Sequence, residues 1–344
     1  MNIAKRHQLR GYILGMLAAA AYGTNPLFAM PLYGEGMSVD SVLFYRYAIA
    51  TVMLGALMLI KGEPFRVRRS DILALAGAGI LFALSSLLLF ASYNYMDVGI
   101  ASTILFVYPV FVAVLMASFF HERISRITLL AIVLALVGIA LLSQGEGEGG
   151  ASSVSVTGII LVILSSLSYA IYMVAINKSR LRHISSLQMT FYSLVFGSLL
   201  FIVRLGFLTD LQMPSGAVSW VCITSLGIFP TIISLLAMTV AIHDIGSTPT
   251  AILGALEPVT GLIIGIAMFG ETLTGQSVSG ILLILVAVTL VIAAKPIMAM
   301  LRNRRRESGH YRRLPLLFRQ FEPAHLLFIY DAGEFAVACA ALGY

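Results

Sequence analysis

Ten apolar segments, each close to the length of a membrane-spanning helix, constrain the fold of this chain more than any other feature. They cover roughly residues 11–33, 41–60, 72–95, 98–120, 124–143, 156–177, 186–208, 217–242, 247–269 and 275–294. A helix that crosses a bilayer needs about 20 predominantly apolar residues. Only 11% of the residues are charged, whereas a soluble domain carries about 25%. We therefore predict an all-α integral membrane protein with ten transmembrane helices.

The second half of the chain repeats the first. Pro109 recurs 149 positions later as Pro258, and Glu122 recurs at the same distance as Glu271. Each proline lies near the middle of an apolar segment, and each glutamate lies at the end of that segment. Because each copy holds five spans, an odd number, the two copies must cross the membrane in opposite orientations. Two inverted five-helix repeats are typical of secondary transporters.

A glycine-rich, acidic stretch divides the two repeats and is expected to be flexible and solvated. The predicted organisation is a first repeat at 1–143, a periplasmic linker at 144–157, a second, inverted repeat at 158–294 and a basic cytoplasmic tail at 295–344. A cleaved signal peptide ending near Ala20 is the alternative for the first span. Against it, Gly11 and Tyr22 match Gly158 and Tyr169 at a constant offset, which indicates a retained copy of the sixth span.

The basic residues lie on one side of the predicted membrane. The loops on the side of the N-terminus hold 17 lysines and arginines, whereas Arg204 alone counts for the other side. Positive charge accumulates in cytoplasmic loops, so we predict that both termini are cytoplasmic. This placement also argues against a nucleic-acid partner. The basic stretch at 295–306 serves either as a topology anchor or as a surface for anionic membrane lipids.

The two repeated prolines predict weak points near the middle of the membrane. A proline removes one helical hydrogen bond and leaves the carbonyl four residues earlier without its amide partner. These carbonyls belong to Leu105 and Gly254. Free backbone groups are tolerated in a membrane when neighbours satisfy them or when they line a cavity. Pro109 and Pro258 therefore mark either broken helices beside a central site or simple packing kinks.

Glu257, directly before Pro258, is the carboxylate that lies deepest in any predicted span. Ionisable groups inside a membrane are costly and are candidates for function. Glu257 could bind a proton, bind a substrate ammonium group or hydrogen-bond a neighbouring helix. Its counterpart in the first repeat is Tyr108, so an ionic role would be asymmetric.

Arg46 lies about one and a half turns into the second span, counted from the outer face. Its guanidinium could reach the membrane interface by snorkelling. Alternatively, it faces the transport pathway and attracts a substrate carboxylate.

Further pathway candidates carry hydroxyl, amide or aromatic groups inside the spans: Tyr22, Asn25, Ser85, Ser86, Tyr93, Tyr108, Tyr169 and Tyr172. Taken singly, each could equally be a hydrogen-bonding contact between helices. Together they predict a midplane cavity for a small polar or zwitterionic solute, formed by the third, fourth, eighth and ninth spans. The six histidines lie at span ends or outside the membrane, and no motif for a metal, a nucleotide or a catalytic nucleophile is present. We expect no metal and no cofactor.

Several short motifs resemble those of the ten-span EamA-type transporters in the drug/metabolite transporter superfamily. They are Tyr22-Gly-Thr-Asn-Pro-Leu-Phe, Phe44-Tyr-Arg-Tyr-Ala, and Ala255-Leu-Glu-Pro-Val259 followed by Gly270-Glu-Thr-Leu273. The resemblance implies a carrier of the bacterial inner membrane that exports amino acids, aromatic or otherwise neutral, or their derivatives by alternating access. One departure is Val107-Tyr-Pro-Val, where the family often has a glutamate before the proline. It puts a symmetric paired-carboxylate mechanism in doubt.

The sequence is also compatible with other functions. A multidrug or other metabolite exporter would share the same fold. A multispan enzyme acting on lipids is an alternative of another class, weakened by the lack of a histidine or aspartate cluster inside the spans. The sequence leaves open whether protons drive the flux and whether the chain is a monomer or a homodimer.

Overall fold

The structure is a computed structural model, which describes residues 3–121, 126–143, 155–178, 181, 184–245, 250, 253–290 and 292. Most of the predicted linker at 144–157, Glu122 and the predicted tail at 295–344 lie outside the described residues.

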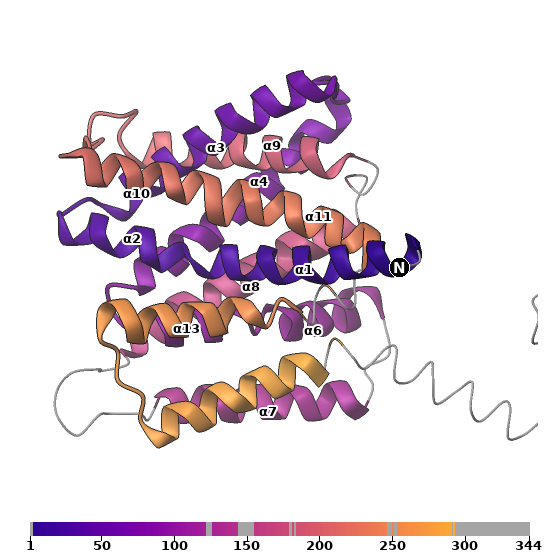
Figure 1. Cartoon of the computed structure of the whole chain (residues 1–344), viewed down its shortest axis with the longest axis vertical. Coiled ribbons are helices and arrows are strands. Elements are labelled where there is room, and N and C mark those ends of the chain that lie inside the picture. The colour runs from indigo at the N-terminus through magenta and orange to yellow at the C-terminus, as the bar shows by residue number, and fades with distance from the viewer. Residues whose placement is uncertain are drawn as a thin grey trace, which may run out of the picture. The chain divides into compact units, whose positions relative to one another are not determined.

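The described part of the chain is built from helices (Figure 1). They are α1 (Ile3–Gly23), α2 (Asn25–Gly34), α3 (Val39–Lys61), α4 (Arg69–Ser92), α5 (Val98–Leu105), α6 (Tyr108–Phe120), α7 (Arg126–Ser143), α8 (Val156–Lys178), α9 (Ser186–Arg204), α10 (Ala217–Gly227), the π-helix η2 (Ile228–Ile233), α11 (Ser234–Ile245) and α13 (Leu256–Phe269). Seven helical segments are long and apolar enough to cross a membrane, and three shorter apolar ones are Arg126–Leu142, Leu256–Phe269 and Gly275–Leu290. These segments correspond to the ten predicted spans, so the all-α membrane fold is confirmed.

Local sequence sets the ends of α3. The hydroxyl of Ser38 accepts a hydrogen bond from the amide of Ser41 (3.3 Å) and so caps the first turn. At the other end, Gly62 adopts a left-handed conformation with φ of 66°. Glycine takes this conformation without steric cost, which ends the helix at Lys61.

The two repeats pack into each other. In Figure 1, α1 of the first half lies between α11 and α13 of the second half, and α4 likewise packs against α8 and α9. Two serines of α8 donate to backbone carbonyls of α4: Ser165 to Ser85 (2.7 Å) and Ser168 to Leu81 (2.8 Å). Such hydroxyl contacts hold helices together where lipid offers no hydrophobic driving force.

Glycines permit close approach of helices elsewhere in the bundle. A Cβ atom on Gly138 of α7 would lie 2.9 Å from the carbonyl oxygen of Gly280, which belongs to the helix Gly275–Leu290, and one on Gly280 would lie 2.8 Å from the carbonyl oxygen of Gly138. These two helices therefore pack backbone against backbone, as small residues allow in membranes.

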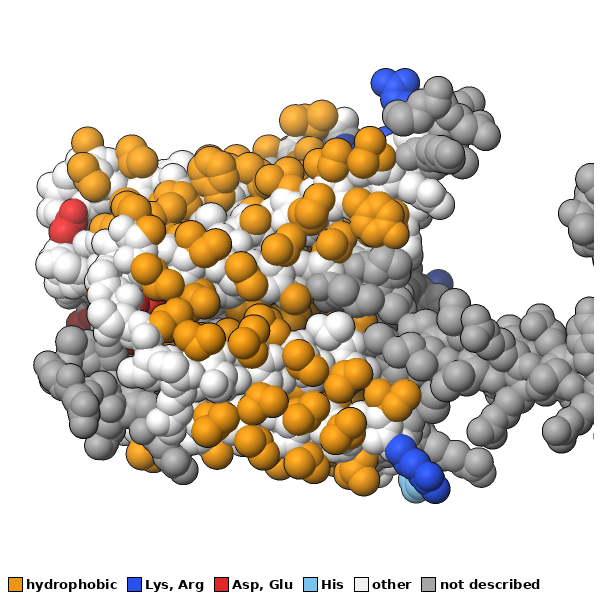
Figure 2. All heavy atoms as spheres, turned by 60° about the horizontal axis from the view of Figure 1, so that its bottom comes forward, with side chains coloured by type: hydrophobic (Ala, Val, Ile, Leu, Met, Phe, Trp, Pro, Cys, Tyr) orange, Lys and Arg blue, Asp and Glu red, His pale blue; other side chains and the backbone are white. Residues whose placement is uncertain are grey.

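The outer surface carries a large share of apolar side chains (Figure 2). Leu73 is 84% exposed, Ile60 82% and Phe119 72%. A soluble protein rarely leaves so much contiguous apolar surface open to water. On a chain with these helices, such a surface faces lipid tails.

Three of the helical spans are interrupted. α1 gives way to α2 at Thr24, just before Asn25 and Pro26. α5 ends at Leu105, and α6 begins at Tyr108, directly before Pro109. A turn at Gly254 and Ala255 likewise precedes α13, which has Pro258 in its first turn. Two of these interruptions fall at the prolines singled out from the repeat.

Candidate functional site

A cavity of about 160 Å³ lies among the helices of the described part of the chain. Its wall is formed by Ala18, Ala19, Tyr22, Arg46, Phe82, Ser85, Leu105, Tyr108, Tyr169, Tyr172, Thr190, Ser193, Pro230, Thr231, Ser234, Leu235, Met238, Gly254 and Glu257. The third, fourth, eighth and ninth spans contribute, as expected. The first, second, sixth and seventh contribute too, so the prediction of four spans was too narrow. Each repeat supplies four of the spans.

The helix interruptions bring backbone to the cavity. Leu105 and Gly254, whose carbonyls lose their α-helical partner to a proline, both line it, and the carbonyl of Gly254 instead accepts a hydrogen bond from the amide of Glu257 (3.0 Å). The carbonyl of Leu105 accepts a hydrogen bond from the hydroxyl of Ser166 on α8 (3.0 Å). A neighbouring helix thus satisfies this carbonyl, which is how broken helices persist in membranes.

Aromatic rings form one continuous wall of the cavity. The rings of Tyr108 and Tyr169 meet edge to face with centroids 4.8 Å apart, and Tyr169 stacks on Tyr172 at 5.8 Å. Phe82 extends the series, with its centroid 5.2 Å from that of Tyr172. These separations are typical of favourable aromatic pairs. The wall therefore presents ring surface and phenolic hydroxyls to a solute.

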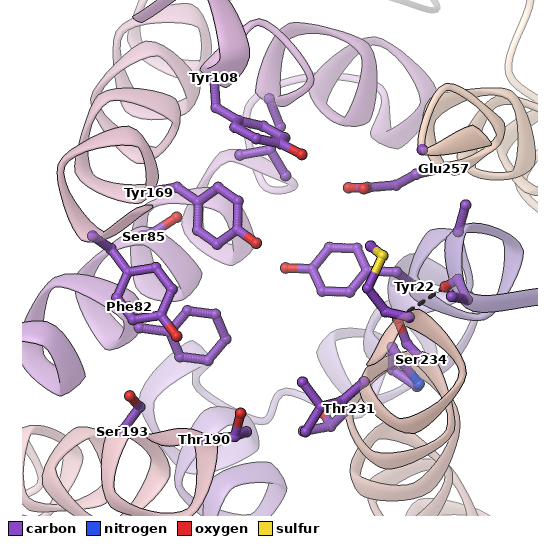
Figure 3. A pocket seen from close by; sticks show the side chains of 18 of the residues that line it. Tyr22, Phe82, Ser85, Tyr108, Tyr169, Thr190, Ser193, Thr231, Ser234 and Glu257 are labelled. Carbon is purple, nitrogen blue, oxygen red and sulfur yellow. Dashed lines mark hydrogen bonds between the residues drawn. The ribbon is translucent and has the colours of Figure 1, made fainter. Parts of the chain in front are cut away.

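Glu257 faces this wall from α13. Figure 3 shows its carboxylate pointing into the cavity, with the hydroxyls of Tyr22, Tyr108 and Tyr169 also directed inward. Tyr22 lies within electrostatic reach of both Glu257 and Arg46. The carboxylate and the phenolic oxygens can together accept hydrogen bonds from a cationic group.

Arg46 is buried, with 2% of its surface exposed, and it lines the cavity. Its Nε donates to the hydroxyl of Thr231 (3.1 Å), and its guanidinium carbon lies 5.3 Å from the centre of the Phe90 ring. The snorkelling interpretation is therefore wrong, because these contacts hold the side chain inside the protein. The structure places Arg46 on the cavity wall, and its role in a transport pathway stays a prediction.

Most of the sequence-predicted pathway residues meet at the cavity. Those along its wall are Tyr22, Arg46, Ser85, Tyr108, Tyr169, Tyr172 and Glu257. Pro109 and Pro258 stand beside wall residues without belonging to the wall themselves.

Three predicted pathway residues belong to the packed protein beside the cavity instead. Asn25 donates through Nδ2 to the carbonyl of Tyr22 (2.8 Å) and so ties the break between α1 and α2 together. Ser86 shares a hydrogen bond with the hydroxyl of Tyr47 (2.8 Å). Tyr93 packs on Phe90 with ring centroids 5.4 Å apart. Asn25 and Tyr93 thus contact residues three positions earlier in the chain, whereas Ser86 contacts Tyr47 of α3. The sequence alone did not reveal any of these contacts.

Several wall residues were missed by sequence reasoning, most clearly Pro230 and Thr231. Pro230 is a proline inside an apolar segment, the same signal that singled out Pro109 and Pro258, but it has no repeat partner. Thr190 and Ser193 of α9 carried no signal, because hydroxyl residues are common in membrane helices.

The arrangement suits recognition of a solute with separated opposite charges. A guanidinium can bind a carboxylate through two parallel hydrogen bonds. A carboxylate beside aromatic rings can bind an ammonium group through charge and cation–π attraction. Among the described residues that form the wall, the ionisable groups are Arg46, Glu257 and the four tyrosines.

An all-α fold of apolar helices, broken near a central polar cavity, defines the class of polytopic membrane transport proteins. The EamA-like transporter family matches residues 9–144 and, a second time, residues 156–293. The chain therefore belongs to this family.

Similar proteins carry names of the same kind. An uncharacterized transporter of Archaeoglobus fulgidus is 29% identical over 276 residues, which cover 80% of this chain and 93% of that protein. An uncharacterized transporter of Synechocystis is 28% identical over 230 residues, covering 65% and 68% respectively. A crystal structure with 18% sequence identity matches 86% of this chain and 98% of its own with a TM-score of 0.59, and this likeness supports the fold alone.

Proposed function

We propose that this chain is a secondary transporter that exports small zwitterionic metabolites, foremost aromatic or other neutral amino acids or their derivatives, across a bacterial inner membrane by alternating access. The observation that carries the proposal is the presence of Arg46 and Glu257 on the wall of one cavity. Arg46 would bind the substrate carboxylate, while Glu257 and the tyrosines would bind the ammonium group.

The size of the cavity favours a small solute over a large drug. Its volume of about 160 Å³ is below the roughly 300–1,000 Å³ of pockets that hold drug-sized ligands. The guanidinium of Arg46 would also oppose the uptake of an uncharged apolar compound, because a buried charge without a partner is costly. An amino acid offers its carboxylate to Arg46 and its ammonium group to Glu257.

A membrane enzyme is the weaker alternative. Within the described residues that form the wall, Glu257 is the one carboxylate, and no histidine accompanies it. General acid–base chemistry usually depends on two such groups. A transporter needs only a site that binds its solute on one side of the membrane and releases it on the other.

Glu257 is also our candidate for proton coupling. A carboxyl group in a water-poor site can exchange a proton for a substrate ammonium group during a transport cycle. Because its counterpart Tyr108 cannot carry a charge at neutral pH, coupling would depend on one residue. The site is contained in a single chain, so a monomer would suffice for transport. A homodimer would carry two such sites.

Transport by the full-length protein in proteoliposomes tests the proposal. Counterflow of the twenty labelled amino acids should identify at least one neutral or aromatic substrate. Arg46→Gln and Glu257→Gln should each raise KM by roughly thirtyfold or more, since each leaves one substrate charge unpaired in a buried site.

Two exposed polar residues provide matched controls. Arg66→Gln and Asp210→Asn make the same chemical changes in loops away from the cavity, and both variants should transport like the wild type. The absence of counterflow for all twenty amino acids would contradict the proposed substrate class. An unchanged rate and pH dependence in Glu257→Gln would contradict the role of Glu257.

A further inference from the structure

The helix opposite Arg46 changes its geometry at Pro230. α10 ends at Gly227, the π-helical turn Ile228–Ile233 follows, and α11 continues from Ser234. In a regular α-helix the amide of residue 230 would donate to the carbonyl of Leu226, but proline has no amide hydrogen. The carbonyl of Leu226 therefore lacks its α-helical amide partner.

Thr231 supplies a donor to this carbonyl through its side chain. Its hydroxyl donates to the carbonyl of Leu226 (3.0 Å), five residues earlier. In an α-helix a threonine hydroxyl reaches the carbonyl three or four residues back. The longer reach here follows from the wider π-helical turn. Pro230 thus removes the α-helical partner of the Leu226 carbonyl, and the hydroxyl of Thr231 gives that carbonyl a donor.

This bond fixes the polarity of the Thr231 hydroxyl. A hydroxyl has one hydrogen and two lone pairs, and its hydrogen is directed to Leu226. Toward Arg46 the oxygen can therefore only accept, and it receives the Nε hydrogen of Arg46 at 3.1 Å. Thr231 is 7% exposed and Arg46 2% exposed, so little water is available to replace this bond.

Phe90 supplies a second restraint on the guanidinium. The guanidinium carbon lies 5.3 Å from the centre of the Phe90 ring, and Phe90 is fully buried. A cation over an aromatic face at this distance is attracted to the ring. The ring limits the plane of the guanidinium, and the bond at Nε limits its rotation within that plane. Together they set the direction of the fork formed by the two terminal amino groups, which is the part that binds a carboxylate.

We infer that Thr231 is a positioning residue of the carboxylate subsite, in which its hydroxyl, oriented by the carbonyl that Pro230 leaves free, aims Arg46 at the substrate. The inference rests on the proposed function, because it assumes that Arg46 binds the substrate carboxylate. Thr231 and the π-helical turn at Pro230 would thus determine substrate affinity, although Thr231 itself does not contact the substrate carboxylate.

A spectroscopic experiment tests the positioning without any substrate. The full-length protein is labelled with ¹⁵N at arginine Nε, and the Arg46 signal is assigned by its loss in Arg46→Lys. Thr231→Val, which keeps the shape but removes the hydroxyl, should shift this signal and speed its hydrogen exchange about tenfold or more, since a bond to a charged donor is lost. Thr231→Ser should keep the wild-type signal, as should Thr209→Val, the same change at an exposed turn.

Counterflow of L-phenylalanine in proteoliposomes tests the consequence for binding. Thr231→Val should raise KM about tenfold while the maximal rate changes less than twofold, and Thr231→Ser should restore the wild-type KM. If the wild-type protein exchanges no amino acid, the proposed function is wrong. The ¹⁵N signal of Arg46 Nε then still tests whether Thr231 positions the guanidinium. An Arg46 signal in Thr231→Val that matches the wild type would overturn the inference. A shifted signal with an unchanged KM would also overturn it, because Arg46 would then not serve the substrate.

Discussion

At the scale of single residues, the contacts of Glu271 explain why a glutamate follows the ninth span. Its Oε1 accepts a hydrogen bond from the amide of Val98 (2.6 Å), and its Oε2 accepts one from the amide of Gly99 (3.2 Å). These amides form the N-terminus of α5, where a negative charge is favourable. Glu271 thus joins a loop of the second repeat to a helix of the first. The repeat pattern singled out this residue, but the sequence did not reveal its partner.

Glu271 should also give the protein a measurable pH dependence of stability. Burial, and secondarily the nearby charge of Asp97, raises the pKa of Glu271 from 4.5 to about 7, against the opposing effect of the two amide hydrogen bonds. A raised pKa means that the folded state binds more protons than the unfolded state between about pH 4.5 and 7. The free energy of unfolding therefore gains a contribution as the pH falls through this window.

Thermal unfolding in detergent at pH 8 and pH 5 measures this contribution. The change in Tm from pH 8 to pH 5 should be more positive in the wild type than in Glu271→Gln, because glutamine cannot take up the proton. Asp210→Asn, a change at an exposed loop carboxylate, should follow the wild type. Equal pH responses of Glu271→Gln and the wild type would show that Glu271 does not titrate in this range.

At the scale of helices, α4 offers a matched pair of glycines that separates packing from helix propensity. A Cβ atom on Gly79 would lie 2.8 Å from the Cβ of Phe196 and 2.9 Å from the carbonyl oxygen of Ser193, both on α9. Gly77, two residues earlier on the same helix, has nothing within 4 Å of the corresponding position. The two glycines are therefore close in sequence but differ in their surroundings.

Gly79→Ala should lower the free energy of unfolding by about 1–3 kcal/mol, because the added methyl group forces α4 and α9 apart. Gly77→Ala should be neutral or stabilising by up to about 1 kcal/mol, since alanine favours a helix more than glycine does. Denaturant titration of the purified protein measures both. Equal effects of the two changes would mean that α4 and α9 do not pack as described.

At the scale of the whole molecule, the excess of lysine and arginine in the loops of one side predicts on which side of the membrane each loop lies. Met213→Cys places a thiol in an exposed loop of the predicted outer side, and Arg66→Cys places one in a loop of the predicted cytoplasmic side. Both are made in a chain with Cys222 and Cys339 replaced by serine. In intact cells an impermeant maleimide should label the first variant. The second should react only after the membrane is permeabilised.

The opposite labelling pattern would place the termini outside the cytoplasm and contradict the topology. Labelling of both variants in intact cells would indicate that the reagent crosses the membrane. The protein without cysteines serves as the control for reaction at other residues. The test concerns orientation alone, so it is independent of the identity of the substrate.

The interleaved packing of the repeats suits the alternating access that we propose. α1 pairs with α11 and α4 pairs with α8, and the repeat relates the first pair to the second. Equivalent pairs on both sides of a central cavity can exchange roles between inward-open and outward-open states. The two halves are nevertheless not chemically equal, because Glu257 stands where the first repeat has Tyr108. Under the proposed alternating access, charge-dependent steps are therefore expected to differ between the inward-open and outward-open states.

The sequence by itself determined the number of spans, their order and the positions of two helix interruptions. These properties depend on local features: the length of an apolar segment relative to the bilayer, and the missing amide hydrogen of Pro109 and Pro258. It also identified Glu257 and the tyrosines as candidates, because polar groups inside spans are costly and few.

Only the tertiary structure decided which candidates face the cavity. Arg46 points inward because Thr231 and Phe90, on two other helices, hold it there, and nothing near Arg46 in sequence reveals either contact. Asn25, Ser86 and Tyr93 carry the same kinds of groups as the wall residues, but each meets a backbone carbonyl, a hydroxyl or a ring within the packed helices. The direction in which a side chain points depends on how its helix is rotated against its neighbours. That rotation is set by contacts between residues far apart in the chain, which a local pattern does not encode.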